Sequence, residues 1–116
     1  MSTITRIAPG ARMSGAVVHD DVVYTAGHVS NVPGGVRAQT ADILAKLDAR
    51  LAEAGSQKSN ILSVQIWLAD IATFAQMNEI YDVWVDKANP PARATVEAKL
   101  AAPEYLVEIA CIAART

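Results

Sequence analysis

The segment 105–114 constrains the fold most, because it is apolar almost throughout and yet contains one carboxylate, Glu108. An apolar run of this length that is rich in valine and isoleucine predicts a buried strand. A carboxylate within such a strand costs free energy unless a cation or a hydrogen-bond donor meets it. The best candidate partner is Arg93, which follows residues 90–92 at the start of another strand-like segment. Because buried charges are usually paired or used, we expect Glu108 and Arg93 to lie close together.

Size and composition exclude several classes of protein. With 116 residues the chain has the size of one domain, residues 1–116, built around a single core. Its net charge of −2 provides no basic stripe for nucleic acid. The single cysteine, Cys111, excludes an internal disulfide and fits a reducing compartment. Since neither a membrane span nor a secretory signal is found, we expect a cytoplasmic protein that binds neither nucleic acid nor membrane.

Apolar periodicity predicts six strands and two helices. In the first helix the apolar residues between Ile43 and Leu51 recur at helical spacing, and Gly55 follows as a C-terminal stop. The second helix can be capped by Asp70 or Thr73 and is expected to end at Asn89-Pro90-Pro91. The expected elements are strands 4–7, 16–19 and 22–26, helix 36–54, strand 61–68, a helix from residue 74, and strands 92–99 and 105–114.

This order of elements predicts an α+β domain in which two helices cover one face of a mixed sheet. The other face then needs cover. If it carries Trp67 or other apolar groups, packing against further subunits would bury them, so composition favours an oligomer. The apolar stripe of the second helix is expected to be core and consists of Phe74, Met77, Tyr81 and Trp84.

Arg93 and Glu108 are the residues best suited to chemistry. A guanidinium can hold a carboxylate by two parallel hydrogen bonds, so Arg93 at the mouth of a cleft would anchor a small organic acid. The alternative for Arg93 is a weak ion pair at the surface. Glu108 could orient and deprotonate a water molecule, as carboxylates do in enzymes that use them as general bases. The alternative is that Glu108 serves only as a structural ion-pair partner of Arg93 or of a lysine. The catalytic and the structural role of Glu108 are compatible with each other.

The other polar residues give weaker signals. His28 follows Gly27 in a loop and could line a pocket, although a single histidine commonly makes only local hydrogen bonds. With His19 as the only other histidine, no metal site is expected. Cys111 is expected to be a small buried side chain. Gly34-Gly35 lacks the lysine and strand context of a phosphate-binding loop, so no nucleotide site is expected.

Four motifs spread along the chain resemble those of one family. They are Tyr24-Thr25-Ala26-Gly27; Leu68-Ala69-Asp70 with Phe74 and Met77-Asn78; Pro91-Ala92-Arg93-Ala94-Thr95-Val96; and residues 107–113. Together they resemble the RidA (YjgF/RutC) family of reactive-intermediate deaminases, and within it the YoaB-like branch. The likeness covers essentially the whole chain, and these motifs are its most specific parts. The resemblance implies a chorismate-mutase-like fold that assembles as a homotrimer, with three clefts between subunits.

The resemblance also implies a reaction. Members of the family hydrolyse enamines and imines, such as 2-aminoacrylate, to 2-keto acids and ammonia, without a cofactor or a metal. By position, Arg93 would bind the substrate carboxylate, Glu108 would place the attacking water, and the backbone of Thr95 would touch the imine nitrogen. Asn78 and Gly27 would shape the cleft. An iminium carbon is already electrophilic, so two well-placed residues can suffice.

Three positions depart from the family pattern. Ala26 stands where a serine is usual, Met13 where a tyrosine is usual, and His28, a further expected substrate-binding residue, where glutamine is common. Contacts from the serine and the tyrosine are therefore absent. Two functions stay open: a hydrolytic deaminase of small enamino and imino acids, and a noncatalytic binding protein for 2-keto acids that keeps Arg93. Both predict a small carboxylate as the ligand.

Overall fold

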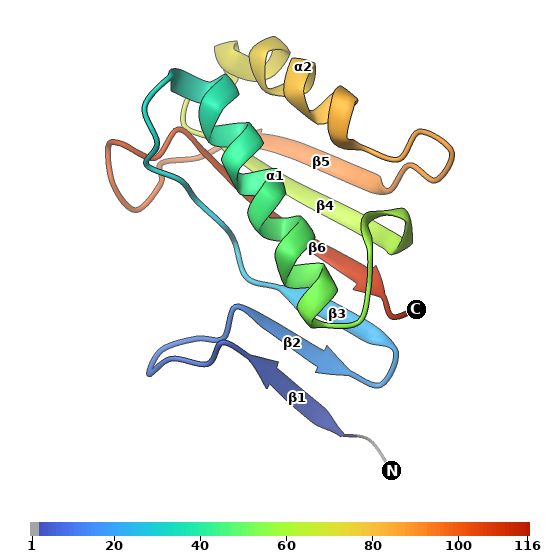
Figure 1. Ribbon diagram of the computed structural model, residues 1–116. Helices are drawn as coiled ribbons and strands as arrows, with labels where there is room; N and C mark the ends of the chain where they lie inside the picture. The colour runs from blue at the N-terminus through green and yellow to red at the C-terminus, as the bar shows by residue number, and fades with distance from the viewer. Residues whose placement is uncertain (1–2) are drawn as a thin grey trace.

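The computed structural model describes residues 3–116, which fold into one six-stranded sheet with two α-helices (Figure 1). The strand order is β1-β2-β3-β6-β4-β5, and β4 and β5 are the one parallel pair among these described strands. The expected α+β class and mixed sheet are therefore confirmed. The elements are β1 Ile4–Ile7, β2 Ala16–His19, β3 Val22–Thr25, α1 Gly35–Glu53, β4 Ile61–Leu68, α2 Phe74–Trp84, β5 Ala92–Glu97 and β6 Val107–Ala114, with short 3₁₀ helices at Lys58–Asn60 and Ile71–Thr73.

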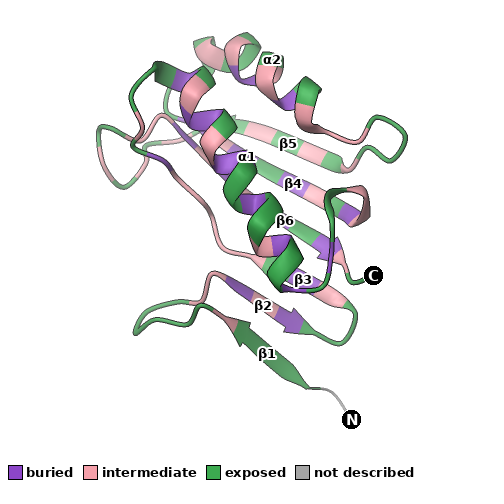
Figure 2. Cartoon of the chain, viewed as in Figure 1, coloured by how far each residue is buried: buried purple, intermediate pink, exposed green. Residues whose placement is uncertain are grey.

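Both helices pack on the same face of the sheet, as predicted, and the core lies between them and the strands (Figure 1). Figure 2 shows the buried residues along the inner side of α1 and on the central strands. Because strand residues alternate between faces, every second residue of β6, and of β4 from Val64 on, enters this core; an irregularity in the pairing between Ile61 and Ser63 breaks the alternation at the start of β4. The most deeply buried large side chains include Ile43, Leu47, Leu51, Ile66, Leu68, Met77 and Ile109.

Neither α-helix of the described chain has the length and the apolar character that a membrane span requires.

No helix of the described part of the chain covers the opposite face of the sheet (Figure 1). Residues that pair across neighbouring strands point to the same face, so the pairing of Trp67 with both Glu108 and Val96 places all three side chains on this uncovered face. Tyr24 and Ile112 pair with each other on the same face. Tyr24, Val96 and Ile112 are 44%, 50% and 36% exposed, respectively. The single chain therefore exposes apolar side chains on β3, β6 and β5 of this face, and such a group of side chains is typical of a surface that binds another molecule.

The end of α2 differs from the sequence prediction. The helix ends at Trp84, well before Asn89-Pro90-Pro91. Val85 adopts an extended conformation, and the Asp86 carboxylate then accepts a 3.0 Å hydrogen bond from the Ala88 N–H. This side-chain turn competes with the helix and stops it before the prolines can.

The predicted capping residues behave differently from one another. Asp70 accepts a 2.9 Å hydrogen bond from the Ala72 N–H and so begins the 3₁₀ helix that precedes α2. Thr73 occupies the N-cap position of α2 but makes no capping bond with its side chain. Gly55, with a φ of 77°, follows α1 as predicted, because this conformation favours glycine.

The apolar stripe of α2 is core over most of its length. Met77 and Tyr81 are buried, and Trp84 packs against the core. The prediction that Phe74 is also core is wrong, because its side chain is 40% exposed. Phe74 is the first residue of α2, next to β5, and within residues 3–116 no further strand extends the sheet beyond β5 to cover it.

Candidate functional site

Arg93 lies on β5, the edge strand, and its half-buried side chain contacts α2. Its Nη1 donates a 2.8 Å hydrogen bond to Asn78 Oδ1. The guanidinium carbon is 4.7 Å from the ring centroid of Tyr81 and 5.6 Å from that of Phe74. At these distances the face of an aromatic ring attracts a cation. The side chains of α2 therefore hold the guanidinium in one orientation.

The guanidinium of Arg93 has no carboxylate partner among residues 3–116, whose ion pairs all involve other cations. A guanidinium offers five N–H donors in a planar fork, and the bond to Asn78 uses one of them. A partly buried cation without a counterion is unfavourable. The arrangement therefore suits an anion that comes from outside the chain, and the planar fork suits a carboxylate.

Thr95 lies on the same side of β5 as Arg93. The two residues pair with Ile66 and Val64 of β4, which both point to the helix-covered face. The Oγ1 of Thr95 is buried and has no hydrogen-bond partner among the described residues. Because β5 is an edge strand, alternate backbone N–H and C=O groups point away from β4. The structure thus brings three predicted site residues, Arg93, Asn78 and Thr95, to one edge of the sheet.

Glu108 lies on β6 and points to the uncovered face, opposite to Arg93. Its partner on β4 is Trp67, whereas the partner of Arg93 is Val64. The expectation that Arg93 and Glu108 meet is therefore wrong within one chain. Two physical reasons account for this: β4 lies between β5 and β6, and residues 64 and 67 of one strand face opposite sides of the sheet.

Gly27, just after β3, lies directly against Glu108. A Cβ atom at this position would collide with Oε2 of Glu108 and would lie 2.9 Å from its carboxylate carbon, so only glycine allows this approach. The next residue anchors the segment to β6. The His28 N–H donates a 2.8 Å hydrogen bond to the Ile109 carbonyl, and the His28 carbonyl accepts a 3.1 Å bond from the Ile109 N–H. The predicted pair Gly27 and Glu108 thus forms a second cluster, on the uncovered face.

The imidazole of His28 does not share that face. Because His28 pairs with Ile109, whose side chain enters the core, its ring lies on the helix side of the sheet. Its Nδ1 donates a 2.7 Å hydrogen bond to the Ala26 carbonyl. Burial lowers the pKa of His28, the bond to Ala26 opposes this, and the cations Arg50 and Lys46 lower the pKa further. The ring is therefore neutral at neutral pH, with Nε2 as an acceptor.

Two of the departures from the family pattern, Ala26 and Met13, lie in neighbouring loops. Ala26 donates its N–H to the Gly15 carbonyl at 2.9 Å, which ties the loop after β3 to the loop after β1. Met13, in that second loop, has an exposed side chain. Neither residue offers a hydroxyl group to a ligand.

Cys111 is buried, as predicted, and burial raises the pKa of its thiol to about 11. Its sulfur accepts a 3.9 Å hydrogen bond from Thr25 Oγ1, and its N–H donates to the same oxygen at 2.9 Å. A thiol with this pKa is protonated at neutral pH and is therefore a poor nucleophile.

The sequence analysis missed the aromatic support of Arg93. Tyr81 and Phe74 were expected only as core, yet both rings lie next to the guanidinium. A signal existed in the spacing of Phe74, Asn78 and Tyr81, which puts one polar and two aromatic side chains on a single helix face. Without the position of β5, nothing in that spacing identified Arg93 as their common partner.

Comparisons with known proteins identify the family. The family model described as Endoribonuclease L-PSP matches residues 3–115. A RutC family protein of Haemophilus influenzae is 49% identical over 113 residues, which cover 96% of this chain and 97% of the relative. The RutC family protein YoaB of Escherichia coli is 45% identical over 112 residues, which cover 97% and 98%. The crystal structure of a YjgF family member from Neisseria meningitidis matches with a TM-score of 0.96 and 39% identity, covering 98% of this chain and 96% of that one. The chain therefore belongs to the RidA (YjgF/RutC) family, which its sequence motifs resemble.

Proposed function

We propose that this protein is a hydrolytic deaminase of small enamino and imino acids of the 2-aminoacrylate type, acting in the cytoplasm. The observation that carries the proposal is the state of Arg93: its guanidinium is half-buried and oriented by Asn78 and Tyr81, yet has no carboxylate partner among residues 3–116. Such a group suits the carboxylate of a small organic acid. Family membership supports the same type of ligand.

A complete site would require two subunits. Within one chain Arg93 and Glu108 point to opposite faces of the sheet. We propose a homotrimer in which each subunit lays its uncovered face against the β5 edge of its neighbour. Arg93 of one subunit and Glu108 of the next would then line a shared cleft, three clefts in all. The exposed apolar side chains around Trp67 support this packing, because an assembly would remove them from water.

The proposed reaction needs only the addition of water and the loss of ammonia. Arg93 binds the carboxylate by two hydrogen bonds and so fixes the position of the imine carbon. Glu108 holds a water molecule and accepts its proton as the water oxygen bonds to that carbon. An enamine substrate first takes up a proton at its terminal carbon and so becomes the imine. In the tetrahedral intermediate Glu108 returns the proton from water to the nitrogen, and the carbon–nitrogen bond breaks as the hydroxyl group loses its proton, which gives a 2-keto acid and ammonia. The backbone of Thr95 would lie near this nitrogen. Because no electron is transferred, we propose neither a cofactor nor a metal.

A noncatalytic binding protein for 2-keto acids is the second candidate. Ala26 and Met13 favour it, because they remove two hydroxyl groups that the family commonly places in the cleft. RNA cleavage, which the description of the family model names, is not proposed, since a chain with a net charge of −2 has little to offer a phosphate backbone.

The proposal is tested by following the loss of an imine that an amino-acid oxidase releases from its amino acid. The wild-type protein should accelerate this loss. Glu108→Gln should lower the rate by about 100-fold and leave binding of a 2-keto acid, measured as a rise in Tm, nearly unchanged. Arg93→Ala should lose both the rate and the binding. Glu104→Gln, which alters an exposed loop carboxylate, is the matched control and should behave as wild type.

Three other results would each overturn part of the proposal. If the wild-type protein gives no acceleration but 2-keto acids raise its Tm through Arg93, the binding function holds and the deaminase is rejected. If neither effect is seen, both functions are rejected. Equal rates for the wild-type protein and Glu108→Gln would reject the role of Glu108.

A further inference from the structure

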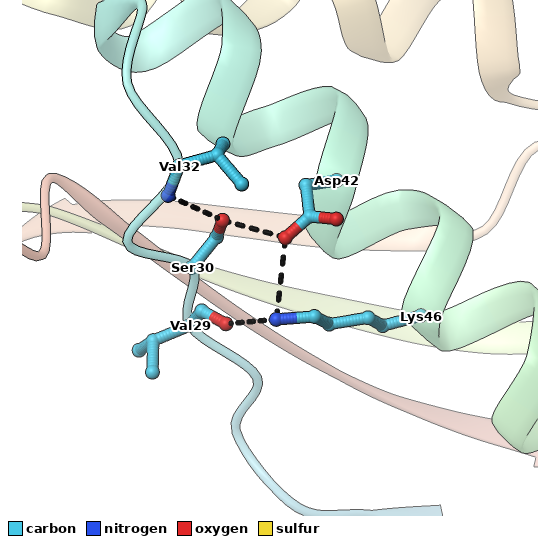
Figure 3. A network of polar contacts seen from close by, with 5 residues as sticks. All are labelled: Val29, Ser30, Val32, Asp42 and Lys46. Atoms are coloured by element: carbon cyan, nitrogen blue, oxygen red, sulfur yellow. Dashed lines mark hydrogen bonds and ion pairs between the residues drawn. The ribbon is translucent and has the colours of Figure 1, made fainter.

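The loop that carries Gly27 is tied to α1 by a network of polar contacts (Figure 3). Ser30 is 2% exposed, and its hydroxyl donates a 2.6 Å hydrogen bond to Oδ2 of Asp42 on α1. One turn further along α1, Lys46 Nζ lies 3.2 Å from the same oxygen and donates a 3.0 Å hydrogen bond to the Val29 carbonyl. Two side chains of α1 therefore hold one side chain and one main-chain group of the loop.

The Ser30 hydroxyl, Oδ2 of Asp42 and Nζ of Lys46 each make two contacts within this network. The Ser30 hydroxyl also accepts a 3.3 Å hydrogen bond from the Val32 N–H, and so makes two bonds in a buried position. Hydrogen bonds from Ser30 and Lys46 lower the pKa of Asp42, so the carboxylate is charged throughout the neutral range. Loss of one partner would leave a buried hydroxyl or N–H unsatisfied, which is unfavourable. The network therefore defines one position for the loop.

The same segment is held from its other side by β6. His28 exchanges two backbone hydrogen bonds with Ile109, the residue that follows Glu108. Gly27, between this anchor and the end of β3, is the residue whose Cα lies against the Glu108 carboxylate. Val29 follows Gly27 by only two residues. A displacement of the Val29 carbonyl would therefore also displace the main chain of Gly27, which lies beside Glu108.

We propose that Ser30, Asp42 and Lys46 are positioning residues for Glu108, an inference that rests on the proposed function. None of the three touches the reacting atoms. They hold the main chain of residues 27–29 between α1 and β6, so that the carboxylate keeps one orientation toward the water. Arg93 lies on β5 and is oriented by α2, neither of which takes part in this network, so its position should not change. Loss of the network should therefore lower kcat without weakening the binding of the substrate carboxylate.

Kinetics of four variants test this split. Ser30→Ala and Lys46→Met should lower kcat by about 10-fold, because a small displacement of a catalytic group is costly, with KM within about twofold of wild type. Lys46→Arg keeps a cationic donor for Asp42 and Val29 and should restore most of the rate. The matched control is Glu79→Gln, which breaks the ion pair of Glu79 with Arg37 between α1 and α2 and should leave kcat unchanged. A rise in KM with constant kcat would overturn the inference.

Hydrogen exchange supplies a readout that does not depend on activity. The His28 and Ile109 amides should exchange about 10-fold faster in Ser30→Ala and Lys46→Met than in the wild type or Glu79→Gln, because local opening becomes easier. Unchanged exchange would overturn the inference whether or not the protein is active. If the wild-type protein hydrolyses no imine, the proposed function fails. Faster exchange in the two variants would then still support the inference that the network fixes the main chain at Gly27. Faster exchange with unchanged kcat in an active protein would reject the positioning role.

Discussion

The two faces of the sheet carry the two halves of the proposed site in different states. On the helix-covered face, Arg93 is already oriented by Asn78 and Tyr81 within its own chain. On the uncovered face, Glu108 lies against Gly27 among apolar side chains that remain exposed in the single chain. Folding of one chain thus orients the guanidinium of Arg93. In the proposed homotrimer, Glu108 would meet a guanidinium only across a boundary between subunits.

The largest effect is expected when the uncovered face is made unsuitable for burial. Trp67→Asp places a carboxylate beside Val96 and directly opposite Glu108 on this face. Burying an unpaired charge costs several kcal/mol, so the concentration at which the assembly dissociates should rise by about 1000-fold or more. Light scattering after gel filtration measures this, with Ala75→Asp on the exposed side of α2 as the control. A wild-type protein that is monomeric at all concentrations would contradict the proposed homotrimer.

A smaller change isolates the Glu108 side. Gly27→Ala adds a methyl group where Oε2 of Glu108 lies, so the carboxylate must move. We expect kcat/KM for imine hydrolysis to fall by about 100-fold, while the rise in Tm with a 2-keto acid stays nearly constant. Gly10→Ala is the control, because the nearest atom to an added Cβ there is 3.5 Å away. Unchanged kinetics for Gly27→Ala would show that the position of Glu108 does not matter.

A variant of α2 isolates the Arg93 side. Asn78→Ala removes the acceptor of the Arg93 hydrogen bond and leaves the aromatic contacts in place. Binding of a 2-keto acid should weaken by about 10-fold, and KM should rise with little change in kcat. Calorimetric titration measures the binding, and Asn60→Ala, in the 3₁₀ helix before β4, is the control. A fall in kcat at constant affinity would contradict a role for Asn78 in binding the substrate carboxylate.

The smallest effect concerns His28, whose ring lies on the helix side. Because its pKa is lowered in the folded chain, the unfolded chain takes up a proton first as the pH falls below 6.5, and the free energy of unfolding decreases. His28→Gln removes this proton uptake. Its Tm should therefore fall by about 2 °C less than that of the wild type between neutral and mildly acidic pH. His19→Gln, at the exposed end of β2, is the control, and equal pH dependence for both variants would contradict the burial of His28.

Most of the fold could be predicted because its signals are local. The alternation over residues 61–68 predicts β4 with the bounds that the structure has, and the helical spacing up to Leu51 with Gly55 behind it predicts α1 to within a residue at each end. The end of α2 could not be predicted by the same means. Two signals can end this helix, the turn at Asp86 and the prolines that follow Asn89. The end of α2 depends on which of them comes first along the chain.

The individual site residues could also be proposed from the sequence, since charged groups in apolar strands are conspicuous. Their mutual position could not. Strands that follow each other in sequence are usually neighbours, which favoured a direct contact between Arg93 on β5 and Glu108 on β6. Here β4 lies between those strands, and its register sends the two side chains to opposite faces. Strand order and register depend on the whole sheet, so no local pattern contains them.

Mixing of subunits tests the central claim most directly. Arg93→Ala and Glu108→Gln proteins, each measured alone, are unfolded together in equal amounts and refolded, and imine hydrolysis is assayed. If each site takes Arg93 from one subunit and Glu108 from the next, every mixed trimer contains one intact site, and activity should return to about one quarter of the wild-type value. If a single chain supplies both residues, no intact site can form. A mixture that stays as inactive as its components, although light scattering and tagged subunits show mixed trimers, would contradict the account.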